Sequence, residues 1–138
     1  MSVPLCVKDK FTCRVSSTLD RNVSEYGKKY MFDDNNERCW QSDKGKSQSV
    51  IITFNEEVEV SLIKIQFQGG FAAEKAHIEA GPDVNNLTFV QDIYPEDVNS
   101  LQEFKLDHLV KATVFKIIFE DTTDFFGRIV IYSLNLYS

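Results

Sequence analysis

From Val50 onward, apolar residues occur in short runs rich in β-branched and aromatic side chains. Such runs predict β-strands, because these side chains pack well on a pleated surface. Clusters of Gly, Pro, Asn and Asp lie between the runs and predict turns. A succession of strands and turns without helical crossovers predicts an antiparallel sandwich or jelly roll. The predicted strands are residues 50–54, 62–67, 87–93, 113–119 and 128–137.

The alternation of apolar and polar positions changes phase near Ser61. Apolar residues occupy even positions up to Leu62 and odd positions from Ile63. Because side chains of a regular strand alternate between two faces, this change predicts a bulge or a new strand start. Helical patterns are limited to single turns at residues 22–26 and 107–110, both shorter than a stable isolated helix.

Composition narrows the class of protein. A chain of 138 residues with 43% apolar residues is sufficient for one core, so we predict an N-terminal segment at 1–12 that can fray and a single domain at 13–138. The net charge of −6 opposes direct binding to nucleic acid, which needs an excess of Lys and Arg. No apolar run approaches the roughly 20 residues that cross a membrane, and charged residues interrupt the first ten, so neither a signal peptide nor a membrane span is predicted.

The three cysteines, Cys6, Cys13 and Cys39, are odd in number and form no CxxC motif. Without a predicted secretory signal, they indicate free thiols in a reducing compartment.

The order of several segments resembles the coagulation-factor type C, or discoidin, family. A short Ser-rich stretch at 14–18 precedes an acidic turn at 32–34, which leads to Cys39-Trp40-Gln41-Ser42 and then to an apolar strand at 48–54. The resemblance extends over about residues 13–137. It implies an all-β fold: an antiparallel eight-stranded jelly-roll β-sandwich of the galactose-binding-like type, with binding loops gathered at one end.

Four further stretches resemble a nuclear branch of this family, at residues 26–29, 66–71, 94–97 and 119–128. This resemblance implies a non-enzymatic protein-binding module whose partner is a nuclear protein, an orphan nuclear receptor, and which represses receptor-driven transcription. It implies a nuclear location, with a cytoplasmic pool as an alternative. Secreted members commonly join the two ends of the domain by a disulfide, whereas this chain has no cysteine after Cys39, which speaks against secretion.

The loop at 121–128 is the sharpest candidate for partner binding. Phe125 and Phe126 are adjacent in a polar turn, so they cannot both point inward if the chain is extended. Exposed rings beside Arg128 have the composition of an interaction hot spot; the alternative is that both rings cap the end of the sandwich. The residues predicted to bind the partner are Tyr26, Lys28, Lys29, Phe71, Asp121, Asp124, Phe125, Phe126 and Arg128.

An acidic loop offers oxygen ligands at Asp33, Asp34 and Asn36. A structural calcium ion could use them, although no cofactor is required for the predicted function. The alternative, which the irregular spacing favours, is an Asx-type turn whose side chains bond their own backbone. Trp40 could stack on a ligand, but the family resemblance implies that it packs in the core.

No residues have the spacing of a catalytic site. His77 and His108 are expected in a strand and a turn, without a nucleophile elbow near either. Cys39 follows Arg38, which could lower a thiol pKa, but a small buried hydrophobe is the commoner role. Asp121 and Asp124 more readily shape a turn than flank a glycosidic bond. We therefore predict that the chain is not an enzyme.

Two alternative binding functions remain open. One is a glycan or small-ligand domain that uses Gln68, Asp121 and Arg128 around a stacking ring, which would require a concave polar pocket. The other is the recognition subunit of a ubiquitin-ligase-like complex, because discoidin relatives serve in that role. It predicts constant association with a large assembly.

Overall fold

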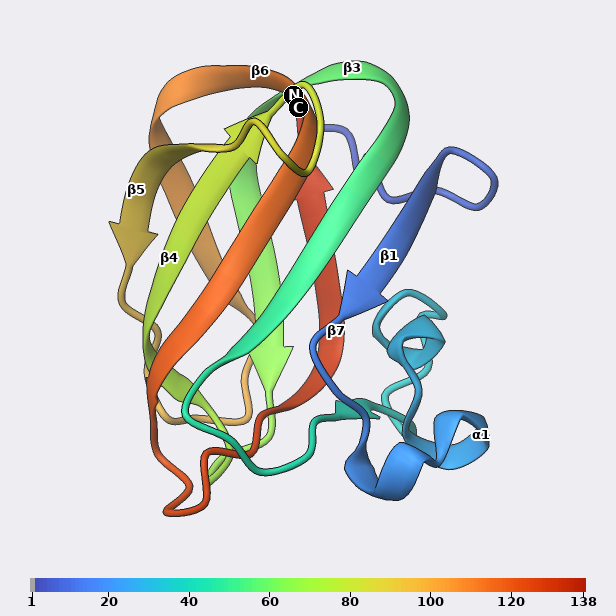
Figure 1. Ribbon diagram of the computed structural model, residues 1–138, viewed down its shortest axis with the longest axis vertical. Coiled ribbons are helices and arrows are strands. Elements are labelled where there is room, and N and C mark those ends of the chain that lie inside the picture. Colours follow the sequence, from blue (N-terminus) through green and yellow to red (C-terminus); the bar gives the residue numbers. More distant parts are fainter. Residues whose placement is uncertain (1) are drawn as a thin grey trace.

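Two layers of antiparallel strands face each other in the computed structural model, which describes residues 2–138 (Figure 1). The strands are β1 (Phe11–Val15), β2 (Trp40–Gln41), β3 (Gln48–Phe67), β4 (Ala73–Gly81), β5 (Thr88–Ile93), β6 (Gln102–Thr122) and β7 (Val130–Tyr137). Short helical turns lie between β1 and β2: η1 (Leu19–Arg21), α1 (Val23–Tyr26) and η2 (Lys28–Met31).

Strands β3 and β6 are long enough to serve both layers. One layer contains β1, the first part of β3, the second part of β6, β4 and β5. The other contains the first part of β6, the second part of β3, β7 and β2. Both long strands bend at the same end of the sandwich (Figure 1). This architecture confirms the predicted all-β jelly roll; residues 2–138 form seven strands, two of them shared between layers, where eight were predicted.

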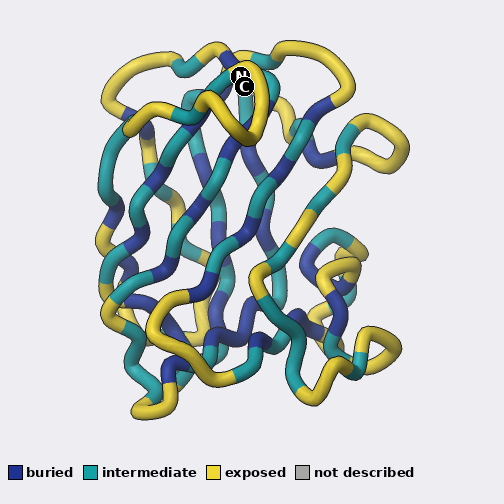
Figure 2. Tube along the Cα trace, viewed as in Figure 1, coloured by how far each residue is buried: buried dark blue, intermediate teal, exposed yellow. Residues whose placement is uncertain are grey.

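The core lies between the two layers, where buried and partly exposed positions alternate along much of β3 and β6 (Figure 2). Aromatic rings from the two layers pack edge to face in the core. The Phe67 and Phe119 rings, for example, have centroids 5.8 Å apart. The largest side chains with no more than 1% exposure on these strands are Trp40, Phe67, Phe115, Phe119, Ile52, Ile63, Ile65, Ile78, Ile117 and Ile131.

The predicted bulge near Ser61 is confirmed. The pairing of β3 with β6 shifts register between Val60 and Leu62. Val60 and Ile63 are both 0% exposed, although a regular strand would place them on opposite faces. The bulge therefore lets one strand fill the core on both sides of its phase change.

The helical turn predicted at 107–110 is wrong. These residues belong to β6, and Val110 pairs with Val60 of β3. His108 consequently lies in a strand rather than in a turn. The other predicted turn is confirmed as α1, whose N-terminus is capped because the Asn22 side chain accepts a hydrogen bond from the Glu25 N–H at 3.2 Å.

The two ends of the chain run beside each other at the end of the sandwich where β3 and β6 bend (Figure 1). The N–H of Leu5 donates to the carbonyl of Leu136 at 2.8 Å, and the N–H of Ser138 donates to the carbonyl of Val3 at 3.0 Å. Residues ahead of Cys13 thus pair with β7 and β3, while the predicted domain boundary at that position stays a prediction. Within residues 2–138, no helix is long and apolar enough to cross a membrane.

Candidate functional site

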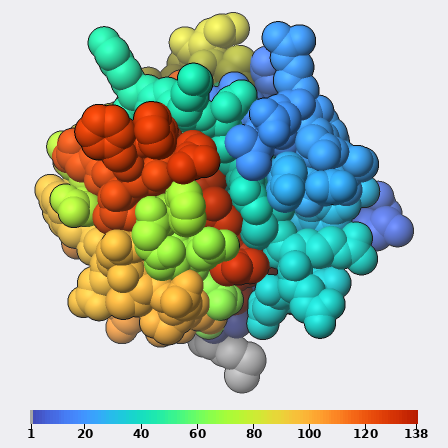
Figure 3. Space-filling model, turned by 90° about the horizontal axis from the view of Figure 1, so that it is seen from below, coloured from blue at the N-terminus to red at the C-terminus, as the bar shows by residue number. Residues whose placement is uncertain are grey.

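Loops from distant parts of the chain meet at the end of the sandwich opposite the termini. Figure 3 views this end directly and shows the segments near residues 125 (red), 70 (green) and 98 (orange) side by side. Hydrogen bonds join neighbouring loops: Gly45 N–H donates to the Phe126 carbonyl at 3.0 Å, and Gly70 N–H donates to Asp97 Oδ1 at 2.7 Å. The predicted gathering of loops at one end is therefore present.

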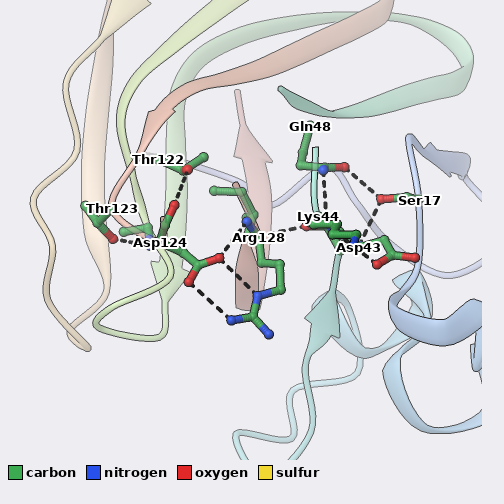
Figure 4. A network of polar contacts seen from close by, with 11 residues as sticks. Ser17, Asp43, Lys44, Gln48, Thr122, Thr123, Asp124 and Arg128 are labelled. Carbon is green, nitrogen blue, oxygen red and sulfur yellow. Dashed lines mark hydrogen bonds and ion pairs between the residues drawn. The ribbon is translucent and has the colours of Figure 1, made fainter. Parts of the chain in front are cut away.

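Asp124 and Arg128 fix the shape of the 121–128 loop. The Arg128 Nε donates to Asp124 Oδ2 at 3.0 Å and its Nη2 donates to Oδ1 at 3.3 Å, while the Arg128 backbone N–H donates to Oδ2 at 3.1 Å (Figure 4). The hydrogen bond from the guanidinium lowers the pKa of the Asp124 carboxyl and raises that of Arg128. A bidentate, charge-assisted pair of this kind holds the loop in one geometry.

Aromatic rings project from this loop. Phe125 is 93% exposed and Phe126 57% exposed, with their centroids 5.2 Å apart in an edge-to-face arrangement. The alternative that both rings cap the sandwich is therefore wrong. The Arg128 guanidinium lies 5.3 Å from the Phe71 ring centroid and 5.5 Å from that of Phe126, so two rings flank one cation and the Phe125 ring packs against the Phe126 ring.

A glycine contact ties the 121–128 loop to the loop at 42–47. Gly127 has φ +79°, and a Cβ there would lie 1.8 Å from the Gly45 carbonyl oxygen. Only glycine combines this left-handed conformation with such a close approach. Lys44 and Lys46 are thereby placed beside Phe125 and Phe126, with which they line a shallow hollow of about 650 Å³.

A buried polar network supports the loops from beneath (Figure 4). The Gln48 side chain is 3% exposed; its Oε1 accepts hydrogen bonds from the Ser16 and Ser17 hydroxyls at 2.6 and 2.8 Å. Its Nε2 donates to the Asp43 carbonyl at 2.8 Å. Within residues 2–138, every buried side-chain nitrogen or oxygen has a hydrogen-bond partner, so the platform under the loops is rigid rather than adaptable.

Trp40 belongs to this platform and not to the surface, which confirms its predicted place in the core. It is 0% exposed, and its Nε1 donates to the Ser17 carbonyl at 3.0 Å. It therefore links the segment at Ser17 to the core beneath the loops.

The structure brings together only part of the predicted partner-binding set. Phe71, Asp124, Phe125, Phe126 and Arg128 form one surface, which we call the loop surface. Asp121 is exposed at the end of β6, with φ 51°. Lys28 and Lys29 instead line a separate groove beside β1, and Tyr26 is partly buried at the end of α1.

Lys44 and Lys46 were not predicted to lie beside Phe125 and Phe126, although the structure places them there. Their segment, Asp43-Lys44-Gly45-Lys46, has the composition of a turn, but nothing local indicates that it meets residues about 80 positions away. Only the arrangement of loops in the family could have suggested it.

The acidic loop forms the turns that its sequence favours. Asp33 Oδ1 accepts the Asn35 N–H at 3.1 Å, and Asn35 Oδ1 accepts the Glu37 N–H at 2.9 Å. Asp34 and Asn36 are exposed. No group of three or more His, Cys, Asp or Glu side chains in residues 2–138 has the arrangement of a metal site. The side-chain oxygens of Asp33 and Asn35 are thus used locally, and calcium at this loop stays a prediction.

The titratable groups considered for catalysis have structural partners. His77 lies in β4, where Nδ1 is 3.0 Å from Asp92 Oδ1 and Nε2 is 3.3 Å from Glu79 Oε2, and its ring stacks on Phe89. Cys39 is buried, and burial raises the pKa of its thiol, which therefore stays protonated and poorly nucleophilic at neutral pH.

The thiols of Cys6 and Cys13 are expected to stay protonated near neutral pH. Burial raises the pKa of Cys6 and of Cys13 from about 9 to about 12. At pH 8, iodoacetamide should therefore label Cys6, which is 8% exposed, at least about a hundredfold more slowly in the folded protein than in denaturant. Equal rates would contradict the burial. The stability contributed by these protonated thiols is fully present below pH 9 and is lost as the pH rises towards 12.

Comparison with known proteins identifies the family. The family model of the F5/8 type C domain matches residues 13–131. The chain is 47% identical over 123 residues to the nuclear receptor 2C2-associated protein of Danio rerio, covering 89% of this chain and 87% of that protein. It is 46% identical over the same length to the protein of that name from Homo sapiens, covering 88% of it.

Solved structures share the fold at low sequence identity. A family 32 carbohydrate-binding module from Clostridium perfringens NanJ, in complex with galactose, superimposes with a TM-score of 0.81 at 19% identity over all of both chains. A second C. perfringens module, in complex with GalNAc-β-1,3-galactose, has a TM-score of 0.82 at 17% identity, covering 99% of this chain and 100% of that one. These identities support the galactose-binding-like fold and nothing about ligand. Together with the matched family model and the curated relatives, they show that this chain belongs to the F5/8 type C, or discoidin, family.

Proposed function

We propose that this chain is a non-catalytic protein-binding module that binds a nuclear receptor of the 2C2 kind through the loop surface. The observation that carries the proposal is the almost complete exposure of Phe125, at 93%, on a loop that the Asp124–Arg128 pair holds in place. The relatives named nuclear receptor 2C2-associated protein support the choice of partner.

The loop surface has the physical properties of an interaction hot spot. Aromatic rings and arginine supply much of the energy of protein interfaces, because rings bury large areas while losing little side-chain freedom and the guanidinium offers several hydrogen-bond donors. Here Phe71, Phe126 and Arg128 are already ordered by mutual contact, and the polar network under them is complete. These side chains would therefore lose little additional conformational entropy when a partner binds.

Repression of transcription is the proposed consequence. The net charge of −6 disfavours direct contact with DNA, so the module would act on the receptor and hinder its attachment to its DNA element. This role requires a nuclear location, to which a cytoplasmic pool could be added. In a gel-shift assay, rising amounts of the protein should reduce the receptor–DNA band without forming a larger complex; a supershifted band would contradict it.

The variant Phe125→Ser/Phe126→Ser tests the interface. Loss of two exposed rings should weaken binding to purified nuclear receptor 2C2 by at least about thirtyfold, since each hot-spot ring contributes about 1–2 kcal/mol. Biolayer interferometry measures the affinity, after circular dichroism has verified the fold.

The matched control is Phe89→Ser/Leu109→Ser, which removes two apolar side chains that are each 58% exposed on β5 and β6. It should bind as the unaltered protein does. Equal loss in both variants would place the interface elsewhere. No binding by the unaltered protein would favour a glycan, tested on a glycan array, or a ubiquitin-ligase-like assembly, tested by elution with a large complex.

The glycan alternative has little support from the polar groups named for it. Gln68 Oε1 accepts a hydrogen bond from the Tyr132 hydroxyl at 3.0 Å, and Arg128 is engaged by Asp124. A sugar would have to displace these partners.

A further inference from the structure

Strand β1 forms an open edge of the sandwich. Among the described residues 2–138 it pairs only with β3, in antiparallel register from Phe11 with Phe54 to Val15 with Val50. The opposite edge of the same layer is bridged, because the Gln91 side chain of β5 accepts the Asp107 N–H of β6 at 2.8 Å. The β1 edge has no such bridge within residues 2–138.

The register shows which backbone groups of β1 face outward. Just beyond its two ends, the Asn55 N–H donates to the Lys10 carbonyl at 3.0 Å and the Ser16 N–H donates to the Ser49 carbonyl at 2.9 Å. In antiparallel pairs, bonded and non-bonded positions alternate. Thr12 and Arg14 therefore bond to β3.

Phe11, Cys13 and Val15 are the intervening positions, so their N–H and C=O groups point away from β3. No hydrogen bond from elsewhere in the described chain reaches these groups. An edge with a row of free donors and acceptors is a template for an added strand.

A groove of about 460 Å³ runs beside this edge, between β1 and η2. Its floor is apolar: the Phe11 and Phe32 rings meet edge to face with centroids 4.8 Å apart, and Cys6 and Cys13 lie alongside. The groove could therefore accept the side chains that an added strand directs to one face.

The rim of the groove carries three lysines and two aspartates, a net charge of +1, in an otherwise acidic protein. Lys8, Lys28 and Lys29 line it together with Asp9 and Asp33, whereas the whole chain has a net charge of −6. Lys28 and Lys29 are both exposed, so their ammonium groups are available to a partner. This local excess of positive charge complements an acidic segment.

We propose that the β1 edge and this groove, together called the β1 groove, bind an extended acidic segment of a partner protein as an additional strand. Backbone groups of the segment pair with Phe11, Cys13 and Val15. Alternate apolar side chains enter the groove, and Asp or Glu side chains lie beside Lys28 and Lys29. This site is separate from the loop surface and does not depend on the function proposed for it.

Affinity selection from a phage-displayed library of random dodecapeptides on the immobilised protein tests the proposal. Enriched peptides should alternate apolar residues with flanking Asp or Glu. Synthetic copies should bind at least about tenfold more weakly to Cys13→Pro, because proline removes an outward N–H and its ring blocks the edge without removing a bond to β3. Cys13→Ala keeps the N–H and should retain binding.

A second pair of variants tests the charges. Lys28→Glu/Lys29→Glu should abolish binding of the acidic peptides, whereas Lys105→Glu/Lys111→Glu, which reverses two exposed lysines of β6, should not. This pair keeps the test decisive if Cys13→Pro fails to fold. Phe125→Ser/Phe126→Ser should retain the peptides, so failure of the loop surface and failure of the β1 groove are distinguished.

Three results would overturn the proposal: no enrichment above a blank support, peptides without acidic residues, or undiminished binding by a folded Cys13→Pro variant. A dimer of the protein in sedimentation experiments that Cys13→Pro abolishes would also overturn it, because the occupant would then be a second copy of this chain.

Discussion

Replacing Trp40 by alanine is expected to lower the free energy of unfolding by about 3–5 kcal/mol, the usual cost of emptying a large aromatic site in a core. The side chain is 0% exposed, so little of the cavity can be refilled by water. Its loss also leaves the Ser17 carbonyl without the indole donor that bonds it at 3.0 Å. Chemical denaturation monitored by circular dichroism measures the effect.

Trp40→Phe separates packing from hydrogen bonding. It keeps much of the volume but removes the indole N–H, so we expect a loss of about 1–3 kcal/mol. A loss as large as that of Trp40→Ala would mean that the hydrogen bond to Ser17 dominates. A loss below about 1 kcal/mol for Trp40→Ala would contradict its place in the core.

Replacing Gly127 by alanine is expected to cost roughly 2–5 kcal/mol, from a left-handed backbone and an overlap with neighbouring backbone. The new Cβ would lie 1.8 Å from the Gly45 oxygen, so the 42–47 and 121–128 loops must separate. Because Gly45 N–H bonds the Phe126 carbonyl, the separation also displaces the exposed rings and should weaken partner binding.

Gly70→Ala is the matched control for this effect. Gly70 has φ +90°, but a Cβ there would meet nothing within 4 Å in the described structure. It should therefore cost only the backbone penalty of about 1–2 kcal/mol. Equal losses at Gly70 and Gly127 would show that the contact with Gly45 is not tight in solution. Thermal unfolding of both variants decides between these outcomes.

The bounds of strands with strong local preference were predictable from sequence, whereas β4 was indicated only by the strand expected around His77. Its residues, Ala73–Gly81, include alanines, Glu and Lys, which have little intrinsic preference for strands. It forms because β5 and β6 pair with it on both sides and because small side chains, such as Ala76 at 0% exposure, fit against the core. Residues 107–110 were misread for a related reason, since pairing with β3 overrides a weak local signal.

The candidate site was predictable only in part for a different physical reason. Adjacent Phe125 and Phe126 indicate exposure through strand geometry alone, because consecutive side chains point to opposite faces. Which residues surround these two rings depends on contacts between distant parts of the chain. Gly45 contacts Gly127, and Arg128 lies against the Phe71 and Phe126 rings. No periodicity records which loops meet, so the sequence did not indicate that Lys44 and Lys46 lie beside this loop, or that Lys28 and Lys29 line a separate groove.

The adjacency of the two chain ends determines how this module can be oriented. Val3 and Leu5 are hydrogen-bonded to Ser138 and Leu136, at the end of the sandwich opposite the loops (Figure 1). Anything tethered to either end, whether a fluorescent reporter, a solid support or another domain, would therefore leave the loop surface pointing outward. Because the two chain ends lie side by side, attachment at either one leaves the loop surface equally accessible.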